Sequence, residues 1–362
     1  MRKTILIVAL VVFVLLGIAG GVGYWMVYGV NTPEYAEARS VKILPDASFE
    51  TVVDSLVTKG VLKNPGTFTL VANATGWSEQ VKPGHYSLES GQSNYDLLNT
   101  IRKGLQTPVR ITIPPGSRPD VVAAVVSKQL NFPPEDFLAA LEDVDLATEL
   151  STDTLHLFSY MLPETYFVYW LTDAKSLVKK VKGEFDQFFT PEMKQQAEEQ
   201  KLSVNEVLRV ASIVEWETNH VEEKPDVAGV YLNRLHHRDF WRLDADPTVE
   251  YALLQLNGKK QGRWGRLFTA DYKIDHPYNT YKYRGLPPGP INNPSPSSIK
   301  AVLQPRDHNY MFFVAKGDGS HTFTRTLSEH LRASREFHRL MRQKRREKAA
   351  AEAAASQAQA LD

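Results

Sequence analysis

The N-terminal segment constrains this chain most strongly. Residues 4–28 read TILIVALVVFVLLGIAGGVGYWMVY and contain no charged side chain. An α-helix rises about 1.5 Å per residue, so this segment can cross a hydrocarbon core roughly 30 Å thick. A cleaved signal peptide is the alternative, but its apolar core is shorter, about 7–15 residues, and a cleavage site follows it. We therefore predict a retained single-pass membrane anchor.

The residues that flank the anchor predict its orientation. Arg2 and Lys3 precede it, and positive charge favours the cytoplasmic side of a membrane. Tyr24, Trp25 and Tyr28 gather at the other end, as aromatic side chains do at a membrane interface. The rest of the chain is accordingly predicted to lie outside the membrane, on the far side from the cytoplasm.

Composition narrows the classes of partner. Of the 362 residues, 43% are hydrophobic and 23% are charged, which suits two or three globular units. The 42 basic side chains balance 42 acidic ones, so no net field attracts nucleic acid and no nucleic-acid partner is expected. The chain has no cysteine, which excludes disulfides, thiolate metal sites and a cysteine nucleophile.

A repeated pattern organises the region after the anchor. A short polar linker is predicted over residues 29–40. Residues 41–62 and 109–130 then share an alternating strand, a proline turn and an amphipathic helix, and residues 84–104 are a looser copy. Repeats of this kind form small sheets with helices on one side. Residues 41–107 therefore look like a LysM-like α/β subdomain, either a glycan-holding module by analogy of fold or a plain spacer.

A helix with two acids is predicted over residues 202–220, LSVNEVLRVASIVEWETNH. Ser203 and Glu206 form a capping box, and apolar residues then recur at helical spacing. Glu215 and Glu217 are two residues apart, roughly 200° around an axis with about 3.6 residues per turn. The two carboxyl groups therefore cannot share a face.

The surroundings of the two acids rank them. Glu217 stacks over Ile213 and Val214, whereas Glu215 stacks over a smaller and more polar surface. Bulky apolar neighbours disfavour the ionised form of a carboxyl group, which keeps a general acid protonated near neutral pH. Glu217 is therefore the better candidate acid. The alternative is that both are ordinary surface glutamates near a helix end.

A long segment rich in turn-forming residues follows at 275–298, with six prolines. Proline and asparagine at this density prevent regular strand pairing. Long ordered loops of this kind commonly bind or catalyse. Residues 344–362 are of low complexity and are predicted to be a frayed helix or a disordered tail.

Five motifs resemble one protein family in their order and spacing. LPETYFVY, VASIVEWET, LDADPTVEYAL, HPYNTYKYRGLPPGPINNPSPSSIKAVLQP and YMFFVAKGDGSHTFTRTLSEH resemble the endolytic murein transglycosylases, membrane-anchored bacterial proteins that cut nascent peptidoglycan strands. The resemblance extends to about residue 341. It implies an α+β protein with a transmembrane helix (4–28), a LysM-like subdomain, and an α+β catalytic domain (108–343). It also implies the bacterial inner (cytoplasmic) membrane, with residues 1–3 cytoplasmic and the catalytic domain periplasmic.

The resemblance also implies roles for single residues. The essential glutamate of the family falls on Glu217, and Glu215 matches a first acid that helps to hold the site. The loop expected to line the cleft begins at Tyr278. Trp216 stands where related sequences usually carry a polar residue, and Glu250 stands at a variable position. The substrate-binding candidates are Tyr278, Asn279, Thr280, Glu215, Thr248 and Glu250.

The activity implied is cleavage of the bond between N-acetylmuramic acid and N-acetylglucosamine, with a 1,6-anhydro end formed and strand elongation terminated. Peptidoglycan strands, the inner membrane and membrane-bound synthases are the implied partners, and no cofactor or metal is expected. Two alternatives remain: a non-catalytic peptidoglycan-binding scaffold, and a lysozyme-like hydrolase that leaves reducing ends.

Other polar residues carry weaker hypotheses. His220, His236 and His237 lack the HExxH spacing of zinc sites and are expected at the surface. Asp244 and Asp246 are expected to serve in a loop and a helix cap, with a calcium site or a second catalytic carboxylate as alternatives. His321, at a strand end, is within reach of the predicted cleft.

Overall fold

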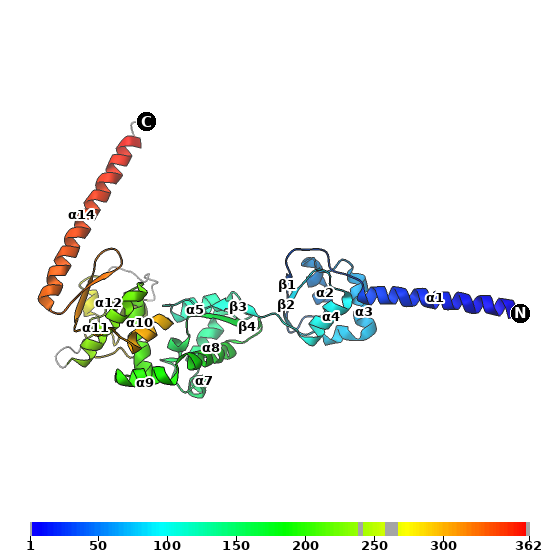
Figure 1. Ribbon diagram of the computed structural model, residues 1–362, viewed down its shortest axis with the longest axis horizontal. Coiled ribbons are helices and arrows are strands. Elements are labelled where there is room, and N and C mark those ends of the chain that lie inside the picture. Colours follow the sequence, from blue (N-terminus) through cyan, green and yellow to red (C-terminus); the bar gives the residue numbers. More distant parts are fainter. Residues whose placement is uncertain (1, 238–241, 258–266, 360–362) are drawn as a thin grey trace. The chain divides into compact units, whose positions relative to one another are not determined.

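The computed structural model of the chain describes residues 2–237, 242–257 and 267–359 (Figure 1). Helices and short strands alternate along it, which confirms a mixed helix and sheet protein. The chain divides into two compact units, each described by itself. Unit 1 contains Met1–Ile111, Lys128–Phe132 and Tyr166–Asp173, and unit 2 contains Thr112–Ser127, Pro133–Thr165 and Ala174–Asp362.

The N-terminal helix α1 (Arg2–Tyr28) coincides with the predicted anchor. None of its residues is buried, and its most apolar window has a mean hydropathy of 3.0. Among the described residues it is the one helix long and apolar enough to cross a membrane. By length and composition, α1 is thus a candidate membrane anchor.

Unit 1 is a small sheet covered by helices. Strands β1 (Arg39–Ile43) and β2 (Gly84–Leu88) pair antiparallel, with Val41 opposite Tyr86. The apolar face of this sheet contributes to a core that includes Leu56, Phe68 and Leu97. The other elements are α2 (Phe49–Thr58), α3 (Pro65–Thr75), the 3-10 turn η1 (Trp77–Gln80) and α4 (Asn94–Lys103).

The segment predicted as a linker, 29–40, is partly built into unit 1. Asn31 and Thr32 are buried. The Asn31 amide nitrogen donates to Asn94 Oδ1 at 2.7 Å and to the Asn64 carbonyl at 2.9 Å. Polar composition predicts exposure, but these asparagines satisfy one another's polar groups inside the unit.

Two further two-stranded sheets follow along the chain. Strands β3 (Val109–Thr112) and β4 (Thr165–Val168) form one, and all of their residues except Thr112 and Thr165 belong to unit 1. Unit 2 is mainly helical, and β5 (Phe312–Ala315) and β6 (His321–Thr324) form its sheet. The helices are α5 (Pro119–Ser127), α6 (Pro134–Glu142), α7 (Val144–Glu149), α8 (Ala174–Phe188), α9 (Pro191–Glu199), α10 (Val204–Glu217), α11 (Lys224–His236), α12 (Asp246–Asn257), α13 (Pro296–Leu303) and α14 (Leu327–Gln359). Short 3-10 turns are η2 (Leu157–Tyr160), η3 (Val221–Glu223) and η4 (Asp271–Lys273).

Helix α10 lies at the centre of unit 2, against α11, α12 and α13. The proline-rich loop before α13 docks on it through buried polar groups. Asn292 Nδ2 donates to the Ser212 carbonyl at 2.7 Å, and the Ile291 amide donates to Ser212 Oγ at 3.1 Å. Asn293 Nδ2 donates to the Met161 carbonyl at 3.0 Å. As predicted, this loop forms no strand in the described part of the chain. These side-chain hydrogen bonds fix it in place instead of the backbone hydrogen bonds of a β-sheet.

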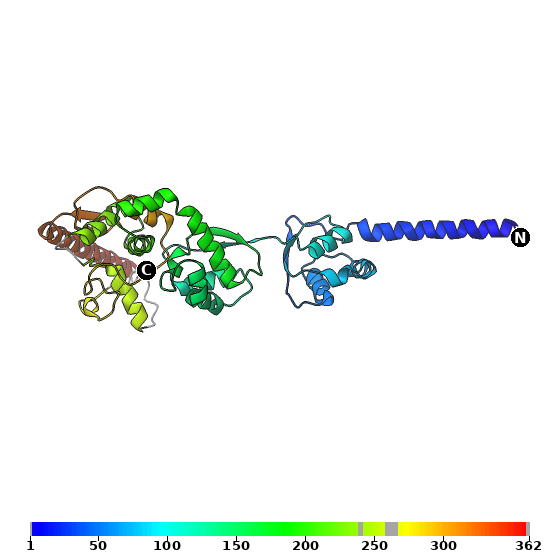
Figure 2. The same ribbon diagram turned by 90° about the horizontal axis from the view of Figure 1, so that it is seen from below.

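The C-terminal elements complete unit 2. Strand β5 is half-buried along its length. Helix α14 runs without a break as far as Gln359, so it includes most of the predicted low-complexity tail (Figures 1 and 2). Of the two forms predicted for that tail, the structure has the helix.

Candidate active site

Helix α10 positions both acids at its C-terminal end. The predicted capping box is present, because Ser203 Oγ accepts from the Glu206 amide and Glu206 returns a bond to the Ser203 amide. The apolar face predicted from the sequence is buried. The helix ends at Glu217, where Thr218 turns to an extended conformation. Glu215 and Glu217 point to different surroundings, as their spacing predicts.

Glu217 is surrounded by protein but keeps partial access to solvent through a cleft. The buried Tyr231 hydroxyl on α11 donates to its Oε2 at 3.0 Å. Burial is the main cause that raises the pKa of Glu217 to about 8, and the negative charge of Asp246 adds to it. The Tyr231 hydrogen bond and the Arg234 charge act in the opposite direction. Glu217 is thus a protonated acid at neutral pH.

The cleft beside Glu217 has a volume of about 620 Å³. Its walls come from α10, α11, the start of α12, η4 and the loop after it, the β5–β6 hairpin and α14. The side chains that line it are both charged and aromatic, which suits a polar ligand with ring faces. They include Glu217, Arg234, Asp244, Asp246, Tyr272, Tyr281, Phe312, Phe313 and His321.

Glu215 is buried on a different side of α10 and does not line this cleft. Its Oε2 accepts from Lys224 Nζ at 2.9 Å, Ser298 Oγ at 2.6 Å and the Ser295 amide at 3.1 Å, and also from Ser295 Oγ. Burial alone would raise the pKa of Glu215, but the Lys224 charge and the serine hydroxyls outweigh it and lower the pKa. Glu215 is therefore an ionised group that ties α10 to α11 and α13.

The Asn279–Thr280 turn is internal rather than part of the cleft wall. Both residues are buried, and Asn279 Nδ2 donates to the carbonyls of Tyr272 and Ile274 at 3.1 and 2.9 Å. Thr280 Oγ1 lies 2.8 Å from Oγ1 of the equally buried Thr248 and accepts from the Ala245 amide. The polar atoms of these predicted substrate-binding side chains form hydrogen bonds within the protein, and these bonds hold the loop in place. The loop in turn places Tyr272 and Tyr281 in the cleft.

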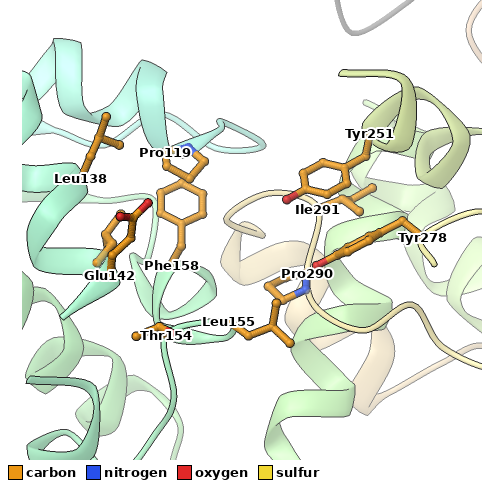
Figure 3. Close-up of a pocket in the computed structure, with 11 residues that line it drawn as sticks. Pro119, Leu138, Glu142, Thr154, Leu155, Phe158, Tyr251, Tyr278, Pro290 and Ile291 are labelled. Atoms are coloured by element: carbon orange, nitrogen blue, oxygen red, sulfur yellow. The ribbon is translucent and has the colours of Figure 1, made fainter. Parts of the chain in front are cut away.

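Tyr278 lines a second, smaller pocket of about 200 Å³ rather than the Glu217 cleft. Figure 3 shows its ring beside that of Tyr251, with Phe158 and Leu138 on the opposite wall. The two tyrosine centroids are 4.6 Å apart. The structure thus separates Tyr278 from the catalytic candidate, although the two were predicted together.

Glu250 lies on α12, half-buried, and its charge contributes to the raised pKa of Glu217. His321 reaches the cleft, as its strand-end position suggests, and its Nδ1 pairs with Glu223 at 2.9 Å. Among the described residues, no three or more His, Asp or Glu side chains are grouped as the ligands of an ion would be.

Three side chains around Glu217 were not found from the sequence. Tyr231 and Arg234 lie within an amphipathic helix and carry no motif of their own. Arg234 is buried, its Nε donates to the Met311 carbonyl at 2.8 Å, and its guanidinium lies 5.7 Å from the Phe312 ring centroid. Tyr281 belongs to the tyrosine-rich loop, in which only its neighbours Tyr278–Thr280 are predicted to bind substrate. The high density of tyrosines in that loop is the sequence feature that could have indicated Tyr281.

The fold and the site together define a class: a mixed helix and sheet protein with one protonated glutamate in a polar, aromatic cleft, in a chain with a candidate membrane helix. The chain belongs to the YceG-like family, whose sequence model matches residues 41–336.

Three relatives support this assignment. The chain is similar to the endolytic murein transglycosylase of Bacillus subtilis (strain 168), with 30% identity over 340 residues that cover 87% of this chain and 91% of that protein. It is 28% identical to the endolytic murein transglycosylase of Streptococcus pneumoniae serotype 2, over 86% of this chain and 61% of that protein. A crystal structure of a YceG-like protein from Listeria monocytogenes aligns with a TM-score of 0.55 and 28% identity, over 82% of this chain and 99% of that one.

Proposed function

We propose that this chain is an endolytic lytic transglycosylase, a lyase that cleaves the bond between N-acetylmuramic acid and N-acetylglucosamine in peptidoglycan strands. The observation that carries the proposal is Glu217, an acid whose pKa is raised to about 8 by burial beside a cleft. The names of the Bacillus and Streptococcus relatives, both endolytic murein transglycosylases, support the substrate class.

In this mechanism Glu217 acts twice. Tyr231 occupies Oε2, which leaves Oε1 to carry the proton. That proton passes to the glycosidic oxygen as the bond to the muramic acid C1 breaks. The ionised Glu217 then takes the proton of the sugar's own C6 hydroxyl, whose oxygen closes onto C1 as a 1,6-anhydro ring. No water is consumed, because the nucleophile is intramolecular and already positioned. A pKa near the working pH suits a group that first gives and then takes a proton.

The remaining predicted site residues act through others. Asn279, Thr280 and Thr248 hold the loop that presents Tyr281, and Glu215 holds α10 to α13. A substrate role for them is therefore indirect positioning. Cleft side chains such as Tyr281 and Phe313 are the ones available to stack on sugar rings.

Helix α1 and unit 1 suggest where the enzyme works. We propose that α1 anchors it in the bacterial inner membrane with the N-terminus cytoplasmic and the catalytic unit periplasmic. Unit 1 is proposed to be LysM-like and to hold glycan. An anchored site meets new strands before they join the mature wall, so cleavage there terminates elongation beside membrane-bound synthases.

Product analysis tests the activity. Purified peptidoglycan digested with the wild-type protein should yield fragments that end in 1,6-anhydro sugars, and the Glu217→Gln variant should yield none, as read by mass spectrometry. Reducing ends would instead show a lysozyme-like hydrolase. Binding without any cleavage by the wild type would show a scaffold.

A further inference from the structure

Asp246, the first residue of α12, lies in the same cleft as Glu217. Each of its carboxylate oxygens accepts from a tyrosine hydroxyl. Tyr281 donates to Oδ1 at 2.6 Å, and Tyr272 donates to Oδ2 at 3.3 Å. The two tyrosine rings support each other edge-on, with centroids 4.6 Å apart and an interplanar angle of 68°.

This arrangement differs from a helix cap, the role expected for Asp246 from the sequence. A capping carboxylate accepts from backbone amides of the first turn. The bonds of Asp246 go instead to hydroxyls of the η4 turn and the loop after it, which line the cleft. The first turn of α12 is bonded by Thr248, whose amide and Oγ1 both donate to the Ala245 carbonyl.

We propose that Asp246 is a second catalytic carboxylate, which stays ionised and stabilises the positive charge that develops at the sugar C1. This proposal rests on the proposed function. Burial raises the pKa of Asp246, and the Tyr281 and Tyr272 hydroxyls act in the opposite direction because they favour the charged form. The same two donors hold both oxygens in place, so little reorganisation is needed when the charge develops. Two carboxyl groups in one cleft then take different roles, one protonated and one ionised.

The step balances without water. The Glu217 proton moves to the glycosidic oxygen, and the electrons of the broken C1–O bond leave with that oxygen. C1 and the ring oxygen share the resulting positive charge, which faces the Asp246 carboxylate. The C6 oxygen then forms a bond to C1, and its proton goes to Glu217. Asp246 begins and ends the cycle ionised.

The charge on Asp246 also bears on the acid. It is the second cause, after burial, of the raised pKa of Glu217. Glu250 on α12 also raises that pKa, whereas Tyr231 and Arg234 on α11 lower it. The other titratable groups that line the cleft are Asp244 before α12, Tyr272 in η4, Tyr281 in the loop, His321 on β6, and His330 and His338 on α14.

The test compares wild type, Asp246→Asn and Glu217→Gln on purified glycan strands. Asp246→Asn should lower kcat about 100-fold, with strand binding within about 2-fold of wild type. Because a negative charge is removed, the pKa of Glu217 should fall and the alkaline limb of the pH–rate profile should move to lower pH. The loss of kcat tests the catalytic role of Asp246, and the movement of the limb reports the charge that Asp246 places on Glu217.

Asp244→Asn is the matched control. Asp244 lines the same cleft, and its positive φ of 47° is one that asparagine tolerates. It should move the alkaline limb less than Asp246→Asn does. A wild-type kcat in Asp246→Asn would overturn the Asp246 proposal, whether or not the limb moves. Absence of anhydro ends in the wild-type digest would overturn the proposed function itself.

Thermal melting shows whether Asp246→Asn folds. If it melts early, Tyr281→Phe decides, because it keeps the ring and removes one donor to Asp246. The proposal then expects a lower kcat, because the Asp246 carboxylate loses one of the two donors that hold it. An unchanged kcat in Tyr281→Phe would contradict it.

Discussion

At the scale of single residues, two glutamates two residues apart in α10 have pKa values shifted in opposite directions. Glu217 is enclosed by protein and lies close enough to the Asp246 carboxylate to be affected by its charge, and its pKa rises to about 8. Glu215 is buried as well, but a lysine and three hydrogen-bond donors outweigh burial, and its pKa falls. Burial therefore dominates at Glu217, whereas the partners outweigh it at Glu215.

Removing the Tyr231 hydroxyl tests the partner of Glu217. That hydrogen bond lowers the pKa of Glu217, so Tyr231→Phe should raise it and move the alkaline limb of the pH–rate profile to higher pH. The shift is opposite to that expected for Asp246→Asn. Both profiles are measured on the same glycan strands. A limb that moves to lower pH in Tyr231→Phe would contradict this description of the site.

Glu217 should also make stability depend on pH. Its folded pKa of about 8 lies above its ordinary value of 4.5. The folded state therefore keeps a proton that the unfolded state loses, and stability falls as pH rises from 4.5 to 8. Glu217→Gln removes this penalty, so its melting temperature should exceed that of wild type by a margin that grows through that range. A constant difference between the two proteins would show that Glu217 titrates normally.

The sequence could indicate Glu217 because apolar residues that help to bury it lie on the same helix. Ile213 and Val214 precede it on the same helix, so their burial is readable from periodicity. Tyr231, Asp246 and Tyr281 reach the cleft only through tertiary packing of α11, α12 and the loop. Their roles depend on which faces of these helices and of the loop pack together, and the spacing of residues along the chain does not specify this packing.

At the scale of elements, the buried Glu215–Lys224 pair joins α10, α11 and the start of α13. Lys224 Nζ also donates to Ser297 Oγ at 2.9 Å. Lys224→Met leaves the Glu215 carboxylate buried without its cation, which should cost about 3–5 kcal/mol of unfolding free energy. Guanidinium unfolding followed by tryptophan fluorescence measures this.

Lys282→Met is the control for that variant. Lys282 pairs with Asp275 at 2.9 Å, but both side chains are exposed. Its loss should cost much less unfolding free energy than the loss of Lys224, because solvent screens the pair. Equal effects of the two substitutions would show that the buried pair does not hold the helices together.

Element prediction succeeded where a local signal exists and failed where polar groups are buried. The start of α10 was predicted from a capping box that is present. In contrast, Asn31 and Asn293 are buried although asparagine favours loops and solvent. Each makes bonds to partners far along the chain, such as Asn94 and Met161. Composition does not reveal those partners, so it predicts fewer fixed contacts for the linker and the loop than the structure has.

At the scale of the whole molecule, the proposed orientation can be tested because the chain has no cysteine. A single Glu89→Cys label lies at an exposed position in unit 1. A membrane-impermeant thiol reagent should modify it in intact spheroplasts, whereas Lys3→Cys should react only after lysis. The reverse pattern would contradict a cytoplasmic N-terminus.

Deleting residues 1–28 separates anchoring from chemistry. The truncated protein should leave the membrane fraction and still release anhydro-ended fragments from purified peptidoglycan. In cells it should no longer shorten newly made strands. Retention of the truncated protein in membranes would show that another part of the chain binds them.

The central claim is that Glu217 is a neutral acid at working pH. Difference infrared spectroscopy of wild type against Glu217→Gln measures this directly in the resting protein. We predict a protonated carboxylic acid band at pH 7 that is present only in wild type and disappears with an apparent pKa of about 8. A Glu217 that is already ionised at pH 7, with a transition near 4.5, would contradict the claim.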